Sequence, residues 1–286
     1  MLKIKHLQVK YKDFTALDIH SEINIKENDF IGVIGANGAG KSTLIKALTD
    51  QVRYTGLIEK PKNIAVHLQE NSYPNVLTCQ TIMEGLLKTT LKKDEKLKSL
   101  INFFNFQDIL RKKVTQLSGG QKQRLTLIMV LYQDAPLTCF DEMTAGLDFE
   151  SRSRLMEKIQ EWYSGKNATL LLVTHYFDEI EKLANKLIII DKGRLIEFGK
   201  TEDLFKKYIG YSTIIIEGDN ENIVLQTGTK IISEKGKQAF SFSNNIDQEE
   251  AVKELIMLGK KFSISNNNIE LIYLNAINQS KECQEN

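Results

Sequence analysis

The sequence predicts an α/β protein with a mostly parallel sheet covered by helices, followed by a smaller α+β region. Two observations support this class. Short apolar segments recur along residues 1–210 with helical stretches between them, the pattern typical of a buried parallel sheet. After Gly210 the chain changes to shorter β-like runs and two helical segments. We therefore expect one domain over residues 1–210 and an accessory α+β domain over residues 211–286.

Local patterns predict the elements of the first region in order. Charged and apolar residues alternate from Lys3 to Tyr11, which indicates an antiparallel strand. Three apolar runs predict buried strands, at Phe30–Ile34, Leu137–Phe140 and Thr169–Val173. A helix is expected over Lys41–Leu48, a lysine-rich helical insert at about residues 75–130, a hairpin over Lys186–Gly199, and a short helix that Thr201 caps.

The second region contains β-like runs at residues 213–217, 229–233, 238–243 and 262–265. Asp247 and Glu250 have the spacing of a capping box, which predicts a helix that Gly259 ends. A further helix is expected over Ile269–Ile277.

Composition excludes several classes of protein. Of 286 residues, 42% are hydrophobic and 26% charged, so the chain is neither largely disordered nor fibrous. The net charge is +1, from 38 basic and 37 acidic residues, which argues against a nucleic-acid-binding surface. No apolar run approaches the ~18 residues needed to span a bilayer. Three widely spaced cysteines indicate reduced thiols in a cytosolic protein.

The strongest local motif is G-x-x-x-x-G-K-[ST], which begins at Gly35 and lies between an apolar strand and a helix. Its glycines let backbone N–H groups approach phosphates, and the helix N-terminus adds further donors. The lysine supplies a charge for the β- and γ-phosphates, and the serine offers a hydroxyl to Mg²⁺. The predicted nucleotide-binding residues are Asn37, Gly38, Gly40, Lys41, Ser42 and Thr43.

A pair of acids, Asp141 and Glu142, follows the apolar run at Leu137–Phe140. Ligands of open α/β sheets bind at the carboxyl ends of strands. We expect Asp141 to hold Mg²⁺ and Glu142 to orient or deprotonate the attacking water. Alone, such a pair is more often a solvated turn, and the phosphate-binding motif reverses that preference.

Residues Leu117–Gln121 read LSGGQ and resemble the signature of the ABC ATPases. Other positions match the family's motifs in the same order. The resemblance implies that Tyr11 stacks on adenine, that Gln69 senses Mg²⁺ and water, and that His175 contacts the γ-phosphate. It assigns Ser118, Gly119, Gly120 and Gln121 to the signature, and Asp148 to the loop at the subunit interface. The other histidines, His6, His20 and His67, have no such context and are expected to be ordinary surface or packing residues.

The resemblance covers residues 1–210 and implies a P-loop NTPase (RecA-like) fold with an antiparallel β subdomain and a helical subdomain. It implies ATP and Mg²⁺ as cofactors, and a head-to-tail pair in which each signature acts on ATP held by the other copy. The pair is a homodimer or includes a paralogous ATPase subunit. The implied partners are transmembrane permease subunits, with the chain peripheral on the cytoplasmic face of the cell membrane and no nucleic-acid partner.

The C-terminal region and the segment Ile269–Leu274 look like the ending of drug, lantibiotic and antibiotic-peptide exporter ATPases. We therefore expect export. An amphipathic helix that packs only on its own domain explains the same spacing equally well. An ABC importer ATPase and a non-transport ABC ATPase remain the alternatives.

Overall fold

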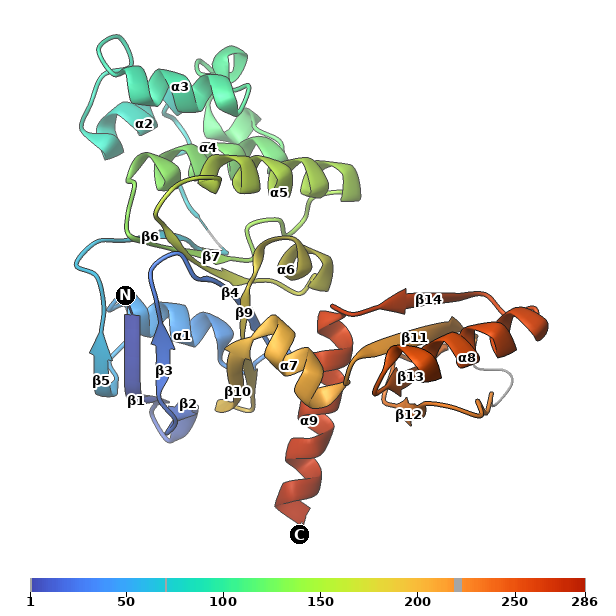
Figure 1. Ribbon diagram of the computed structural model, residues 1–286. Coiled ribbons are helices and arrows are strands. Elements are labelled where there is room, and N and C mark those ends of the chain that lie inside the picture. The colour runs from blue at the N-terminus through green and yellow to red at the C-terminus, as the bar shows by residue number, and fades with distance from the viewer. Residues whose placement is uncertain (1, 70, 219–222, 286) are drawn as a thin grey trace.

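A computed structural model describes residues 2–69, 71–218 and 223–285. It contains two sheets and the helices that cover them (Figure 1). The larger sheet has the strand order β3-β1-β2-β10-β9-β4-β8-β7-β6, and β5 pairs with β1 at one edge. Its strands are β1 (Leu2–Tyr11), β2 (Phe14–Ile19), β3 (Ile23–Ile25), β4 (Phe30–Ile34), β5 (Thr55–Glu59), β6 (Ile64–His67), β7 (Leu137–Asp141), β8 (Thr169–Val173), β9 (Lys186–Asp191) and β10 (Arg194–Lys200).

The larger sheet joins a parallel and an antiparallel part. Pairs β6–β7, β7–β8, β4–β8 and β4–β9 are parallel, whereas β1 pairs antiparallel with β2, β3 and β5. Strands β7 and β8 are buried along their whole length, as strands covered on both faces must be. This arrangement confirms the predicted mostly parallel α/β fold with an antiparallel β part.

Helices cover both faces of the parallel strands (Figure 1). On one side, α1 (Lys41–Leu48) buries its apolar residues against β1–β4, in a cluster that also contains residues of β7, β8 and β9. On the other side lie α4 (Gly119–Tyr132) and α5 (Phe149–Tyr163), and the short helices α2 (Cys79–Leu87) and α3 (Glu95–Phe103) pack beyond them. Helix α6 (Phe177–Leu183) follows β8.

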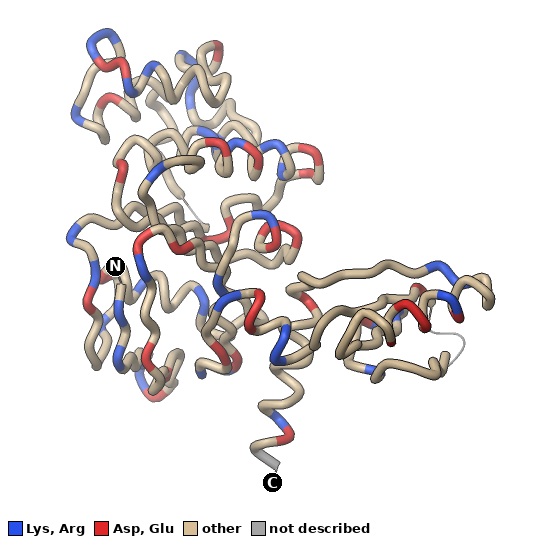
Figure 2. The backbone as a smooth tube through the Cα atoms, viewed as in Figure 1, with Lys and Arg blue, Asp and Glu red and all other residues tan. Residues whose placement is uncertain are grey.

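The smaller sheet is antiparallel and has the order β12-β13-β11-β14, formed by β11 (Ser212–Glu217), β12 (Thr229–Ile231), β13 (Lys237–Phe242) and β14 (Phe262–Ser265). Helix α8 (Asn245–Met257) packs on it with an apolar cluster of its own. Helices α7 (Thr201–Tyr208) and α9 (Ile269–Glu285) pack together, and α9 also packs against α6. Acidic and basic residues are interspersed along both parts of the chain (Figure 2). Within the described residues, no helix combines the length and the apolar character needed to cross a bilayer.

Three local predictions were wrong in detail. Thr201 is the first residue of α7 rather than its cap, and its hydroxyl donates to the carbonyl of Asn185 at 3.4 Å. Helix α8 is capped by Asn244, whose side chain accepts from the Asp247 N–H at 3.0 Å, so the predicted capping box lies inside the helix. Helix α9 continues to Glu285 rather than ending at residue 277, since no glycine or proline interrupts it.

Candidate active site

Four loops bring the predicted site residues to one edge of the parallel strands. The phosphate-binding loop follows β4, the loop with Gln69 follows β6, Glu142 follows β7 and His175 follows β8. Because these strands are parallel, their carboxyl ends meet at the same edge. The loops line a cleft of about 670 Å³. Of the predicted residues, those that line it are Tyr11, Asn37, Gly38, Gly40, Lys41, Ser42, Thr43, Gln69, Glu142 and His175.

The phosphate-binding loop has the backbone that its glycines permit. Gly38 and Gly40 adopt positive φ angles of 78° and 111°. A Cβ on Gly40 would lie 2.9 Å from the carbonyl oxygen of Ala16, so a larger residue would also collide with β2. Lys41 is only 6% exposed, and its ammonium donates to the carbonyls of Gly35 at 2.7 Å and Ala36 at 3.0 Å. Burial lowers the pKa of Lys41, while the charges of the nearby carboxylates oppose that shift.

Ser42 lines the cleft and the buried Asp141 lies beside it, and together they offer groups suited to a hard cation. The Ser42 hydroxyl donates to Asp141 Oδ1 at 3.2 Å. Burial raises the pKa of Asp141, the Ser42 hydrogen bond opposes this, and the charge of Glu142 adds to it. A hydroxyl and a carboxylate oxygen are ligands that Mg²⁺ prefers, and a cation here would stabilise the ionised form of Asp141.

Glu142 is held by side chains from two neighbouring loops. His175 Nε2 lies 2.6 Å from its Oε1, and Gln69 Nε2 donates to its Oε2 at 2.8 Å. The backbone of Glu142 has a positive φ of 51°, unusual for a residue with a side chain, and its N–H donates to the carbonyl of Val173 at 2.9 Å. Such strain persists where the surroundings over-determine a conformation. The β7 and β8 loops therefore direct this carboxylate toward the two side chains.

One wall of the cleft is aromatic. Tyr11 at the end of β1 is 43% exposed, and Phe14 at the start of β2 is 65% exposed. Both line the cleft together with Ala16. Exposed rings beside a phosphate-binding loop offer a stacking surface for a flat base. Sequence reasoning missed Phe14; the signal was its position across the two-residue turn from Tyr11.

The signature residues lie outside this cleft. Ser118 caps α4 by accepting from the Gln121 N–H at 3.3 Å, and the Gln121 side chain accepts from the Ser118 N–H at 3.1 Å. Ser118 and Gly119 are exposed, and Gly120 approaches Leu147 of the next loop. The first turn of α4 thus presents N–H groups and a hydroxyl to solvent, which suits an anion.

Asp148 caps α5 through the backbone N–H of Ser151 at 2.9 Å, and the Ser151 hydroxyl also donates to it, at 2.7 Å. These two hydrogen bonds lower the pKa of Asp148. The residue is exposed and does not line the cleft. The structure therefore gives Asp148 a local role as the exposed cap of α5.

A buried network behind the cleft was not predicted. Glu179 of α6 is 1% exposed and accepts from the hydroxyls of Thr144 and Thr174, each at 2.7 Å. Thr144 follows Glu142 by two residues, and Thr174 directly precedes His175. Burial raises the pKa of Glu179. One carboxyl group thereby joins the two loops that carry Glu142 and His175. Thr144 lies 35 residues before Glu179, so no contiguous motif indicated the network.

Comparisons with known proteins agree with this geometry. A family profile described as ABC transporter matches residues 20–145. The thiamine import ATP-binding protein ThiQ of Haemophilus ducreyi is 30% identical over 200 residues, which cover 64% of this chain and 94% of the relative. The Nod factor export ATP-binding protein I of Neorhizobium galegae is 29% identical over 261 residues, which cover 84% of this chain and 75% of the relative.

Solved structures share the fold. One is a dimeric post-hydrolysis state of an ATP-binding cassette bound to ADP and Pi, with a TM-score of 0.63 and 21% identity over 70% of this chain and 98% of that chain. The P-loop NTPase fold predicted from the sequence is therefore confirmed. With the family profile, the thiamine-import relative and the nucleotide cleft in agreement, the chain belongs to the ABC transporter ATP-binding subunits and is an ATPase of that family.

Proposed function

We propose that Glu142 is the general base that takes a proton from the water attacking ATP, with Gln69 and His175 as its positioning partners. The observation that carries this proposal is the direct contact of both side chains with the two oxygens of that carboxylate, at 2.8 and 2.6 Å. A general base must lie within hydrogen-bonding reach of its proton and must be oriented by its neighbours. His175 also lines the cleft, where its ring can donate to the terminal phosphate.

We propose that Lys41 and the loop N–H groups bind the β- and γ-phosphates, with Asn37, Gly38, Gly40 and Thr43 forming the rest of the cradle. Ser42, Asp141 and Gln69 would hold Mg²⁺, and the close approach of the first two supports this assignment. When bound, the ion neutralises charge on the transferring phosphate. Tyr11 and Phe14 would contact the adenine ring.

We propose that two copies, or one copy and a paralogous subunit, join head to tail around two ATP molecules. Ser118, Gly119, Gly120 and Gln121 would then contact ATP bound mainly by the partner, with Asp148 at the interface. What supports this is the exposure of the signature turn and its separation from the cleft of its own chain. A two-fold axis would place each signature opposite the phosphate loop of the other copy.

Mixed dimers test this arrangement. Lys41→Ala disables the phosphate loop and Ser118→Arg blocks the signature, so each variant alone should have very little activity. In a one-to-one mixture half of the dimers are mixed, and each has one intact composite site. ATPase activity should recover to about a quarter of wild type. If tandem-affinity purification yields mixed dimers that show no activity above the two parent variants, the shared-site arrangement is wrong.

We propose export of a drug or antimicrobial peptide through separate transmembrane permease subunits, with the chain on the cytoplasmic face of the membrane. The relative named for Nod factor export supports this direction. We propose that residues 211–286 form an accessory domain, whose resemblance to the ending of exporter ATPases also favours export. The ATPase domain would cover residues 1–210. The accessory region has a separate sheet and an apolar cluster of its own, which supports the division.

Import is the second candidate, favoured by the relative named for thiamine import. The experiment is purification of the tagged chain with its native membrane partner, followed by reconstitution into vesicles with the ATPase outside. Export predicts that ATP drives a drug or antimicrobial peptide from the outside of the vesicles into the lumen, without any solute-binding protein. Transport that proceeds only outward from the lumen and needs a solute-binding protein would overturn export and establish import.

A further inference from the structure

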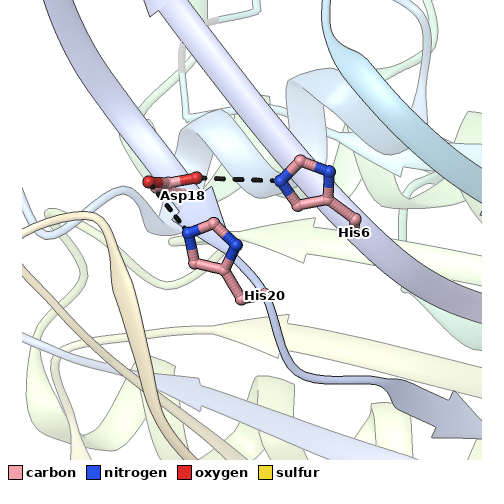
Figure 3. Close-up of side chains that lie close together, drawn as sticks. All are labelled: His6, Asp18 and His20. Atoms are coloured by element: carbon pink, nitrogen blue, oxygen red, sulfur yellow. Dashed lines mark ion pairs between the residues drawn. The ribbon is translucent and has the colours of Figure 1, made fainter.

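The outer face of the antiparallel strands carries a cluster of metal-ligating side chains, formed by His6 of β1 and by Asp18 and His20, on and just after β2 (Figure 3). One ligand atom from each of the three lies within 4.8 Å of the other two. His20 Nε2 is 3.2 Å from Asp18 Oδ2, and His6 Nε2 is 3.9 Å from Asp18 Oδ1. The two rings are stacked, with centroids 5.1 Å apart.

An irregularity in β1 creates this juxtaposition. The pairing of β1 with β5 shifts register between Ile4 and His6. Ile4 and Leu7 are fully buried, so the strand places two consecutive residues, Lys5 and His6, away from the core. Strict alternation would have turned His6 inward with Ile4. A β-bulge re-aims a side chain in this way, and here it sets His6 on the face that already carries Asp18 and His20.

The cluster also leaves a polar atom without a partner. His6 Nε2 is shielded from solvent and has no hydrogen-bond partner among the described residues, although it lies on the side of the ring nearest Asp18. At 3.9 Å the carboxylate of Asp18 is too distant for a hydrogen bond with His6.

A further side chain orients the carboxylate of Asp18. Gln8 donates to Asp18 Oδ1 at 3.2 Å. Second-shell hydrogen bonds of this kind orient the ligands of metal sites.

We propose that His6, Asp18 and His20 bind one divalent transition-metal ion of the zinc, nickel or copper class. Two imidazoles and one carboxylate suit these metals rather than Mg²⁺ or Ca²⁺. Metal–ligand bonds of ~2.0–2.2 Å place ligand atoms ~3.3 Å apart in a tetrahedral site. The 3.2 Å between His20 Nε2 and Asp18 Oδ2 is close to this value, and His6 Nε2, 3.9 Å from Asp18 Oδ1, would move closer when the metal binds. The side chains of His6, Asp18 and His20 are 44%, 28% and 73% exposed, so the cluster lies at the surface, where water can complete the coordination once the His6 ring turns toward the metal.

The site would join the strands that lead to the aromatic wall of the nucleotide cleft. Strand β1 ends at Tyr11 and strand β2 begins at Phe14. The backbone N–H of Asp18 donates to the carbonyl of Gly193 at 2.6 Å. The N–H of Gly193 in turn donates to Ala39 in the phosphate-binding loop at 2.9 Å. A bound metal would therefore brace the hairpin that carries the base-stacking rings.

The test is Zn²⁺ binding by the full-length chain without nucleotide, in a Cys283→Ser background that removes the exposed thiol. Isothermal titration with zinc chloride should show one site per chain at micromolar affinity. The substitutions His6→Asn, Asp18→Asn and His20→Asn should each weaken it at least tenfold, and Gln8→Ala about tenfold. Excess Mg²⁺ should not compete. Saturating Zn²⁺ should raise the melting temperature by ~5 °C in the parent chain and by none in the His6→Asn variant.

His175→Ala is the matched control, because His175 is the other exposed histidine and lies beside a carboxylate of the ATPase site. Zinc binding should persist in this variant. If His175→Ala abolishes binding, or if the parent chain binds no more zinc than the His6→Asn variant, the proposed site does not exist. Because the readouts are stoichiometry and melting temperature without nucleotide, failure of the ATPase assignments would not affect the result.

Discussion

Replacement of Glu142 by glutamine is the sharpest test of the proposed catalytic centre. The amide has nearly the shape of the carboxylate and keeps one oxygen that can accept from Gln69 or His175, which contact the native side chain at 2.8 and 2.6 Å. It cannot take a proton from water. The variant also removes one negative charge from a cleft that binds a polyanion, so ATP affinity should stay the same or increase.

The expected fall in kcat follows from the loss of general-base catalysis. General-base catalysis contributes ~10²–10⁴-fold, which at about 1.4 kcal/mol for each tenfold corresponds to a barrier increase of ~3–5 kcal/mol. We therefore expect kcat to fall by that factor while KM is unchanged or lower, the pattern of an interaction used mainly in the transition state. Slow turnover should also let ATP-bound dimers accumulate.

Single-turnover phosphate release measures the chemical step, and size-exclusion chromatography with ATP measures the dimer. Glu157→Gln is the matched control, because this glutamate is exposed on α5 and away from the cleft. A Glu142→Gln variant that hydrolyses ATP within threefold of wild type would refute the assignment of this carboxylate as the base.

Three further outcomes are expected. Phe14→Ala should weaken ATP binding about three- to tenfold in a calorimetric titration through loss of ring stacking, with unfolding unchanged because the ring is exposed; equal affinity would remove Phe14 from the site. Glu179→Ala should lower the free energy of unfolding by ~2–4 kcal/mol, because two buried threonine hydroxyls lose their acceptor; an unchanged urea midpoint would contradict this. Burial, and then the nearby Glu234, raise the pKa of Glu270 to about 7, so the folded chain holds a proton that the unfolded chain releases. The free energy of unfolding should therefore fall by ~1–2 kcal/mol, after allowance for exposure, as pH rises from about 4.5 to about 7. Glu270→Gln should flatten that part of the curve of unfolding free energy against pH. Parallel curves for the variant and the wild type would show that this carboxyl does not titrate as expected.

Much of the fold was predictable from short-range patterns. The strand at Thr169–Val173 and the helix at Lys41–Leu48 have the bounds read from the sequence, because each is an apolar run or a helix start with clear local signals. Helix ends were less predictable. Asn and Asp are both residue types that cap helices, so the sequence did not show whether Asn244 or Asp247 caps α8; in the structure Asn244 accepts from the Asp247 N–H.

The candidate site was predictable where its residues are contiguous. Each of three motifs spans only a few consecutive residues: the phosphate loop, the acids at the end of β7 and the exposed signature turn. Chain connectivity therefore already brings the groups of each motif together. Phe14 and Glu179 were missed because their roles depend on neighbours from other strands and helices.

The sequence was enough to identify the family and the order of its motifs and to predict the phosphate-binding residues, since these depend on local spacing. Two contacts became visible only in the folded chain: Gln69 and His175 meet on the carboxylate of Glu142, and His6 lies beside Asp18 and His20. The physical reason is the same in both cases. Strand order and register, including the irregularity after Ile4, arise from pairing between distant segments, and a shift of one residue would turn these side chains to the other face.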